Sequence, residues 1–297
     1  MTPEEIRERF NTITVWQRGS ERAPHKPLLA LYAIAKLLRG EPRMISYAEI
    51  DRDLSRLLVE FGPRRQSYHP EYPFWRLQND GLWELSQTER LSVRRGNTDA
   101  KKSELLEYKV QGGFPPEVFE ELSRNKTLAR QIVQHLLDAN FPETLHGDIL
   151  DAVGIEFGVD ARVVIARDPE FRERVLRAYE YSCAVCGFDV RLGNILVAIE
   201  AAHIKWHQAG GPDEERNGLA LCTLHHKLFD RGVFTLSNSM SVIVSEDANG
   251  TCGFQEWVIA YHGKAIRPPQ RPTYYPDENW VAWHVREVFQ GPGRYER

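Results

Sequence analysis

Two short stretches decide the fold of the C-terminal half of this chain: CAVC at residues 183–186 and CTLH at residues 222–225. Each stretch places two metal-binding side chains three positions apart. Two such pairs are what a closed, tetrahedral structural zinc site requires. Buried free cysteines and an isolated surface histidine would not produce two matched pairs. We therefore expect a structural Zn²⁺ bound by Cys183, Cys186, Cys222 and His225.

A second set of polar residues lies between and directly after the two pairs. The chain reads EAAHI at residues 200–204, NGL at 217–219 and HHKLFD at 225–230. Hydrolysis of a phosphodiester needs a deprotonated water, a cation against the developing charge and help for the leaving 3′ oxygen. A neutral imidazole suits the first of these tasks near physiological pH.

The stretch from Cys183 to Phe234 resembles the HNH endonuclease family, in its form with an EAAHI strand, an NGL turn and a CxxHHxxFD helix. The resemblance implies that His203 is the general base and that His226 binds a catalytic divalent ion, Mg²⁺ or Mn²⁺. It also implies that Asn217, the central residue of the motif, orients the loop and belongs to the catalytic set. His225 would face the zinc and His226 the active site, since neighbouring helix residues point about 100° apart.

The chain departs from that family at one position. Many of its members have an acidic residue directly before the base histidine, where this chain has Ala202. Glu200 either supplies the missing carboxylate to the catalytic ion or orients His203. It is as readily an exposed strand residue without a role, because strand alternation leaves its face undetermined.

The bulk properties set limits on the class of protein. With 297 residues, the chain has room for one large domain or two ordinary ones. No apolar run approaches the roughly 20 residues that cross a bilayer, and the charged start MTPEEIRERF is unlike a signal peptide. We expect a cytoplasmic protein that does not bind membranes. The net charge of −4 argues against coating nucleic acid through bulk charge, but permits a local basic groove.

The N-terminal half reads as helices followed by a hairpin. The run at residues 27–39 predicts a buried helix that stops at Gly40, and Ser46 with Glu49 predicts a capped helix that stops at Gly62. PFWRLQ at 73–78 and LWEL at 82–85 predict a strand–turn–strand around Asn79-Asp80-Gly81. Helices are expected again over 103–140, interrupted at Gly112-Gly113 and Pro115-Pro116.

These elements predict an α+β fold in two domains. Helices before a hairpin are typical of a winged-helix-like module, here the mainly helical reader domain over residues 1–142. A linker region is expected at 143–165. The zinc-braced ββα-metal (HNH) nuclease domain would span 166–297, opening with a helix at Asp168-Pro169 and closing with a strand near 239–245 and a helix over 278–289.

The N-terminal half carries a second resemblance. The run RAPHKPLLAL at 22–31, with YHPEYPFWRL at 68–77, resembles the sulfur-binding domain of phosphorothioate-dependent restriction endonucleases. In that family this domain precedes an HNH domain, which is the order seen here. The resemblance implies double-stranded, phosphorothioate-modified DNA as the partner, with contacts from His25, Lys26, Tyr68, His69, Pro70 and Arg76.

The chemistry of that reading can be stated from the residues. A phosphorothioate replaces one phosphate oxygen by a larger and softer sulfur, so a reader needs an apolar cup beside cationic donors. Tyr68 and Pro70 offer the apolar surfaces, and Arg76 is one of the donors. Without the resemblance, a helix N-terminus explains His25 equally well, and a place in the core explains residues 68–75 equally well. For Phe74 and Trp75 the core is the better interpretation.

The two halves together predict a type IV-like restriction endonuclease. One nuclease site makes one nick, so a homodimer would be needed to cut both strands. Its interface could include Trp257, Trp280 and Trp283, although core packing explains them equally well. Two alternatives stay open: an HNH endonuclease directed to another DNA modification such as methylcytosine, and a zinc protein that binds DNA without cleaving it.

Overall fold

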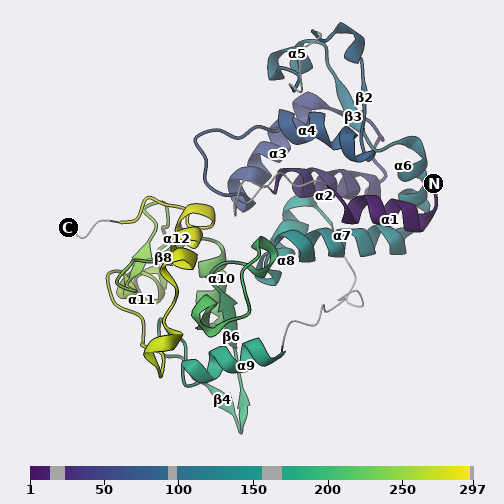
Figure 1. Ribbon diagram of the computed structural model, residues 1–297. Coiled ribbons are helices and arrows are strands. Elements are labelled where there is room, and N and C mark those ends of the chain that lie inside the picture. The colour runs from purple at the N-terminus through teal and green to yellow at the C-terminus, as the bar shows by residue number, and fades with distance from the viewer. Residues whose placement is uncertain (14–23, 93–98, 156–168, 295–297) are drawn as a thin grey trace. The chain divides into compact units, whose positions relative to one another are not determined.

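The protein is described by a computed structural model that covers residues 1–13, 24–92, 99–155 and 169–294 (Figure 1). The chain divides into two compact units, Met1–Val163 and Val164–Arg297. In the described ranges, every helix is too short or too polar to cross a membrane.

Helix α2 (His25–Leu38) forms the centre of the first unit. Every residue from Pro27 to Leu37 is buried. Because the helix is apolar on nearly all sides, it needs partners on all sides. It packs against five helices: α3 (Tyr47–Phe61), α4 (Glu71–Arg76), α6 (Pro116–Arg124), α7 (Lys126–Asn140) and α8 (Glu143–Val153). The predicted buried helix is confirmed.

The predicted ends of the helix that follows α2 are also confirmed. The hydroxyl of Ser46 accepts the backbone N–H of Glu49 at 3.3 Å and so caps α3. The second bond of the capping box expected here, from the N–H of Ser46 to the carboxylate of Glu49, does not form, because that carboxylate contacts the ammonium of Lys36 at 2.5 Å. Helix α3 ends at Phe61, directly before Gly62.

The predicted strand at residues 73–78 is wrong. Residues 73–76 belong to α4, and the next four form the 3-10 helix η1 (Leu77–Asp80). Phe74 and Leu77 are fully buried three positions apart, which is a helical spacing that places both on the core side of the segment. The turn signal at residues 79–81 therefore ends a helix here. Only LWEL contributes a strand, β2 (Glu84–Ser86).

The partner of β2 is a strand that the sequence pattern did not indicate. Strand β3 (Gln111–Gly113) lies at the interruption expected at Gly112-Gly113 and pairs antiparallel with both β2 and β1 (Ile45–Ser46). Two of its three residues are glycine, because other groups approach closely. A Cβ on Gly112 would lie 2.3 Å from Nε1 of Trp83. The winged-helix-like arrangement stays a prediction.

The remaining elements of the first unit are helical. Helix α1 (Pro3–Asn11) packs on α7, and α5 (Lys102–Glu107) packs on α3. Helix α8 occupies the start of the segment expected to be a linker, residues 143–165, and packs on α2 and α7. Residues 156–168, including Asp168 with its expected capping role, lie outside the described ranges.

The second unit is built around an antiparallel hairpin. Strand β6 (Ile199–His203) pairs with β7 (Gly218–Cys222), so that His203 lies opposite Gly218. Helix α10 (Thr223–Asp230) follows β7 directly, which gives the expected ββα order. Both α10 and α9 (Pro169–Ala178) pack against the hairpin.

Smaller elements complete the unit. Two more hairpins are β4 (Arg191–Leu192) with β5 (Ile195–Leu196), and β8 (Phe234–Leu236) with β9 (Val242–Val244). Helix α11 (Phe254–Trp257) precedes the last helix, α12 (Glu278–Glu287), which packs on β8. Trp283 is 2% exposed and packs edge-on against Trp206, so this side chain belongs to the core, whereas Trp257 is 47% exposed.

The close packing around β3 gives a stability prediction. Gly112→Ala should lower the free energy of unfolding of the first unit by about 1–3 kcal/mol, because the added methyl overpacks the core. Gly147→Ala in α8 is the matched control, since nothing lies within 4 Å of its added Cβ. That change should be neutral or stabilise by roughly 0.5–1 kcal/mol. Urea denaturation of the two variants measures both, and equal midpoints would contradict this account of β3.

Candidate metal centre and nuclease site

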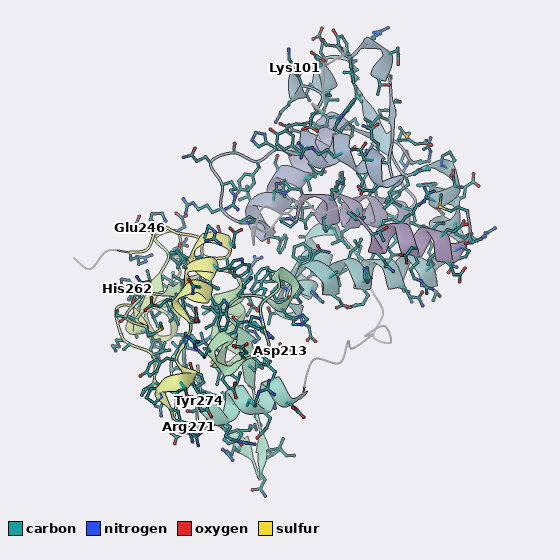
Figure 2. The ribbon with its side chains drawn as sticks, viewed as in Figure 1. Lys101, Asp213, Glu246, His262, Arg271 and Tyr274 are labelled. Atoms are coloured by element: carbon teal, nitrogen blue, oxygen red, sulfur yellow. The ribbon has the colours of Figure 1, made fainter. Side chains whose placement is uncertain are left out.

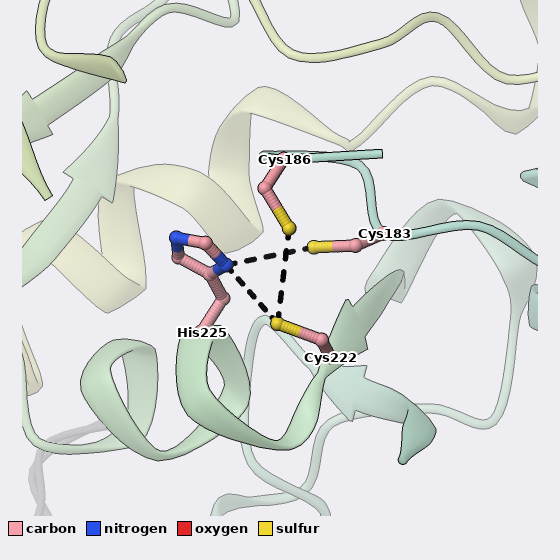
Figure 3. A group of neighbouring side chains, drawn as sticks. All are labelled: Cys183, Cys186, Cys222 and His225. Atoms are coloured by element: carbon pink, nitrogen blue, oxygen red, sulfur yellow. Dashed lines mark hydrogen bonds between the residues drawn. The ribbon is translucent and has the colours of Figure 1, made fainter. Parts of the chain in front are cut away.

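The structure brings Cys183, Cys186, Cys222 and His225 together, as the sequence predicts (Figure 3). Their four ligand atoms lie within 4.8 Å of one another. Sγ of Cys183 is 3.7 Å from Nδ1 of His225, and Sγ of Cys186 is 3.9 Å from Sγ of Cys222. Sulfur and nitrogen ligands at about 2.0–2.3 Å from a tetrahedral ion stand roughly 3.5–3.8 Å apart. The cluster therefore has the donor set and the spacing of a metal site.

Two local structures hold these ligands. Cys183 and Cys186 lie on a tight turn, closed by the N–H of Gly187 on the carbonyl of Cys183 at 2.8 Å. Gly187 has a φ of 77°, a conformation that glycine adopts without strain. Cys222 is both the last residue of β7 and the N-cap of α10. The cluster thus joins the turn, called the knuckle (residues 183–187), to the start of α10.

The protonation of His225 suits a ligand. Its Nε2 lies 2.9 Å from the carbonyl oxygen of Trp257 and so must carry the proton, which leaves the Nδ1 lone pair toward the thiols. Burial would lower the pKa of His225, but Cys183 and Cys222 outweigh it and raise the pKa to about 10. A bound cation replaces the extra proton that such a site attracts.

A carboxylate missed by the sequence reasoning contacts the expected general base. His203 is the last residue of β6, and its Nε2 lies 2.7 Å from Oδ1 of Asp213. The ring of His203 also stacks on Phe171 of α9, with 4.1 Å between centroids. Asp213, labelled in Figure 2, lies in the loop between β6 and β7. In the sequence, the only indication of a role for Asp213 is its position in a loop that contains Gly210 and Gly211.

Asn217 is fully buried and ties that loop together. Its Oδ1 accepts the N–H of Lys205 at 2.8 Å. Its Nδ2 donates to the carbonyls of Lys205 and Pro212, both at 2.9 Å. These bonds join the two ends of the loop on which Asp213 sits. All three of these hydrogen bonds join the side chain of Asn217 to backbone groups, so this side chain stabilises the conformation of the loop.

His226 lies between two carboxylates. Its Nδ1 is 2.6 Å from Oε2 of Glu200, and its Nε2 is 3.2 Å from Oδ2 of Asp230. Burial would lower the pKa of His226, but Asp230 and Glu200 raise it to about 9. Glu200 thus contacts His226, the residue expected to bind the catalytic ion, and the choice among its three expected roles stays a prediction. The side chain of Glu200 is 41% exposed, whereas those of His226 and Asp230 are 5% and 2% exposed.

In the first unit, four of the basic side chains gather near the start of α2. Burial, together with the charges of Arg65, His69 and Arg76, lowers the pKa of His25 to about 4. At neutral pH, His25 is therefore an uncharged hydrogen-bonding group. Among these charges, His69 and Arg76 belong to the expected contact set, whose role in binding DNA stays a prediction.

An aromatic residue that the sequence reasoning passed over lies between two of them. Tyr72 is 38% exposed, and its ring stacks on His69 with 4.7 Å between centroids. The guanidinium of Arg76 lies over the same ring at 4.9 Å. Arg76 also binds both carboxylate oxygens of Asp99, at 2.7 and 2.6 Å. Tyr72 and Arg76 are four positions apart, so a helix predicted over this segment would have indicated that their side chains meet.

The other expected contact residues are placed differently. Lys26 forms an ion pair with Asp80 at 2.5 Å, with its side chain 13% exposed. Pro70 is buried at the N-cap of α4, and Tyr68 is half-buried. Phe74 lies in the core, as expected. Arg22, the first residue of the quoted motif, lies outside the described ranges.

Comparisons with known families agree with the expected identity of both halves. Residues 3–157 match the family profile of the ScoMcrA-like DNA sulfur-binding domain, and residues 183–237 match that of an HNH endonuclease domain, HNH_2. No curated protein matches the chain.

Several solved structures are similar to the first half. The sulfur-binding domain of ScoMcrA complexed with phosphorothioated DNA is 22% identical with a TM-score of 0.45, over 50% of this chain and 94% of that chain. The corresponding domain of SprMcrA, also complexed with phosphorothioated DNA, is 23% identical with a TM-score of 0.44, over 52% and 95%. The type IV phosphorothioation-dependent restriction endonuclease ScoMcrA is 22% identical with a TM-score of 0.42, over 54% of this chain but 30% of that chain.

The cluster gives a metal-content prediction. Cys186→Ser should lose the bound metal and destabilise the second unit by at least about 3 kcal/mol, because structural zinc contributes roughly 10–16 kcal/mol of apparent binding free energy in small domains. Cys252→Ser is the control, since Cys252 is exposed and outside the cluster. Elemental analysis and thermal melting report the two quantities. A Cys186→Ser protein with full metal content and an unchanged melting temperature would rule the site out.

Proposed function

Because this chain belongs to the ScoMcrA-like DNA sulfur-binding domain family over residues 3–157 and carries an HNH endonuclease domain over 183–237, we propose that it is a type IV-like restriction endonuclease. Its first unit recognises phosphorothioate-modified double-stranded DNA, and its second unit hydrolyses a phosphodiester bond nearby. The observation that carries this proposal is the imidazole of His203, held by Asp213 at the end of β6 in the HNH-matching segment. Zinc binding alone would require neither residue.

The metal of the Cys3His cluster is taken to be structural Zn²⁺. Three thiolates and one imidazole are a preferred donor set of zinc, and four protein ligands leave no open position for a substrate. The hydrogen bond from His225 to Trp257 is the kind of outer contact that fixes such a ligand. On this account the zinc holds the unit together and takes no part in hydrolysis.

The catalytic ion is assigned to Glu200 and His226. Asp230 accepts from Nε2 of His226, which turns the Nδ1 lone pair toward the carboxylate of Glu200 at 2.6 Å. Two electron-rich atoms at that distance need a proton or a cation between them, and the partly exposed Glu200 gives a cation access. A Mg²⁺ or Mn²⁺ ion bound there would supply positive charge for the phosphate.

His203 acts as the general base in this proposal. A proton on its Nε2, donated to Asp213, makes Nδ1 the nitrogen that takes the proton from water. Stacking on Phe171 fixes the plane of the ring. Asn217 closes the loop that carries Asp213, so its catalytic role is to hold that carboxylate in place. The products would be 5′-phosphate and 3′-hydroxyl ends.

The reading of DNA is assigned to the surface around Tyr72. Its ring is exposed and polarisable beside Arg76 and His69, which is the combination that a soft, anionic phosphorothioate requires. His25 contributes a neutral donor nearby. The contacts expected from Lys26, Tyr68 and Pro70 stay part of the proposal. A chain with one nuclease site makes one nick, so cutting both strands requires two chains, most simply a homodimer.

The matched-substrate experiment tests the function. Duplexes that differ only in one phosphorothioate are incubated with the protein and Mn²⁺ or Mg²⁺, and cleavage is followed on a gel. The modified duplex should be cut at least about 10-fold faster, a preference of roughly 1.4 kcal/mol. Tyr72→Ala should reduce this preference without changing the melting temperature. Equal cutting of both duplexes by the wild type would refute the sulfur-reader assignment.

Variants of the base and its partner test the mechanism. His203→Ala should lower the cleavage rate by about 10²–10⁴-fold, the usual contribution of a positioned base. Asp213→Asn should cost roughly 10–100-fold, because an amide holds the imidazole less firmly than a carboxylate. Glu214→Gln is the control, since it makes the same charge change at an exposed neighbouring position. Unchanged cleavage by His203→Ala would remove the residue from the mechanism.

A further inference from the structure

One segment of the second unit carries positive charge that the functions above do not use. Residues 257–276, here called the strap, contain Lys264, Arg267 and Arg271 and no aspartate or glutamate. The chain as a whole has 42 acidic and 38 basic residues, so a stretch of this length with cations alone is a departure from its average. The strap is also rich in tyrosine and proline.

The cations of the strap are exposed and lack acidic partners. Lys264, Arg267 and Arg271 are all exposed, and across the described part of the chain no carboxylate contacts any of the three. By contrast, Arg177 of α9 lies 3.2 Å from Glu173. Glu180, an acid outside the strap, accepts a hydrogen bond from the side-chain amide of Gln270 at 3.5 Å. The positive charge of the strap is therefore available to a ligand.

The aromatic residues of the strap lie among these cations. The guanidinium of Arg271 lies over the ring of Tyr274 at 5.8 Å, and Figure 2 shows the two side chains together at the edge of the unit. Tyr275 is 38% exposed beside them. Arginine, lysine and tyrosine side chains are common donors to the phosphate oxygens of duplex DNA. Prolines at 268, 269 and 272 restrict the backbone, so the surface is preformed.

At one end the strap is attached to the metal knuckle. The N–H of Arg267 donates to the carbonyl of Ala184, between the two cysteines, at 2.8 Å. The guanidinium of Arg267 lies over Gly187, where an added Cβ would stand 2.8 Å from its NH1 atom. Further along, the N–H of Gln270 donates to the carbonyl of Ala178 at the end of α9.

At the other end the strap reaches the loop of the nuclease site. The 3-10 helix η6 (Pro272–Tyr274) packs against η4 (Glu215–Asn217), which ends at the buried Asn217. Directly after the strap, Asp277 binds Arg216 twice: its N–H donates to the carbonyl at 3.0 Å, and its carboxylate pairs with the guanidinium at 2.6 Å. Arg267 and Arg271 thus lie on the stretch of chain that runs from the knuckle to the loop that carries Asp213, and Lys264 lies beside β9, whose Val242 donates to its carbonyl.

We propose that the strap is a second DNA-binding surface, by which the nuclease unit holds the phosphate backbone of the duplex irrespective of its sequence or modification. The inference rests on the proposed function, since it takes duplex DNA as the substrate. Exposed cations bind phosphates as point charges and carry no base information. The strap would therefore keep the duplex against the loop of Asp213 and Asn217, while the first unit decides which duplex is held.

The salt dependence of DNA binding tests this proposal. The triple variant Lys264→Gln, Arg267→Gln and Arg271→Gln is compared with the wild type on an unmodified duplex, without added Mg²⁺ or Mn²⁺. Each phosphate contact contributes about 0.9 to the slope of log K against log salt, so loss of three contacts should lower the slope by about 2–3. Metal content and melting temperature should not change.

Single variants supply the matched comparison. Arg271→Gln should lower the slope by about 1, whereas Arg177→Gln, the same charge change at a paired arginine of the same unit, should leave it as it is. An unchanged slope in the triple variant, with the wild type binding DNA, would overturn the strap and leave the proposed function standing. A lowered slope in a protein that cuts no phosphorothioate duplex would support the strap and contradict the nuclease.

Discussion

The second unit depends on the four-residue cluster of Cys183, Cys186, Cys222 and His225. It joins the knuckle to the first turn of α10, and through Nε2 of His225 it reaches the carbonyl of Trp257 at the start of the strap. The sheets of the unit are two-stranded hairpins, which are marginal on their own in water. A metal that fixes α10 also fixes His226, the next residue after a ligand. Fold and chemistry therefore depend on the same constraint.

The sequence predicted the parts of the fold whose signals are local. Ligand pairs, the apolar run of α2 and the cap at Ser46 each determine structure within a few residues. Residues 73–78 were assigned the wrong structure because the turn signal after them fits the end of a helix as well as a hairpin, and burial of Phe74 decides between the two. The sequence did not predict strand β3, because its glycines are required by the close approach of side chains distant in the sequence, such as Trp83.

The candidate site follows the same division. His203, Asn217 and His226 were named from the resemblance of their segment to the HNH family, but their partners depend on how a loop or a neighbouring helix returns to them. Asp213 is ten positions from His203 in the chain, and no periodicity links the two. The sequence leaves three interpretations of Glu200, and its contact with His226 depends on the position of α10, which no local pattern gives. In the first unit, Tyr72 stacks on His69 at the start of α4, and most of the residues of this helix had been predicted to form a strand.

The central claim is that one metal builds the nuclease unit and another enables hydrolysis. It is tested most directly by the cleavage rate of protein that holds one metal ion per chain, measured on a phosphorothioate duplex as Mn²⁺ is added. We expect no cleavage without Mn²⁺ and a rate that rises to saturation with it, while the first metal stays bound. Full activity with the single cluster metal alone would contradict the division between the two sets of residues.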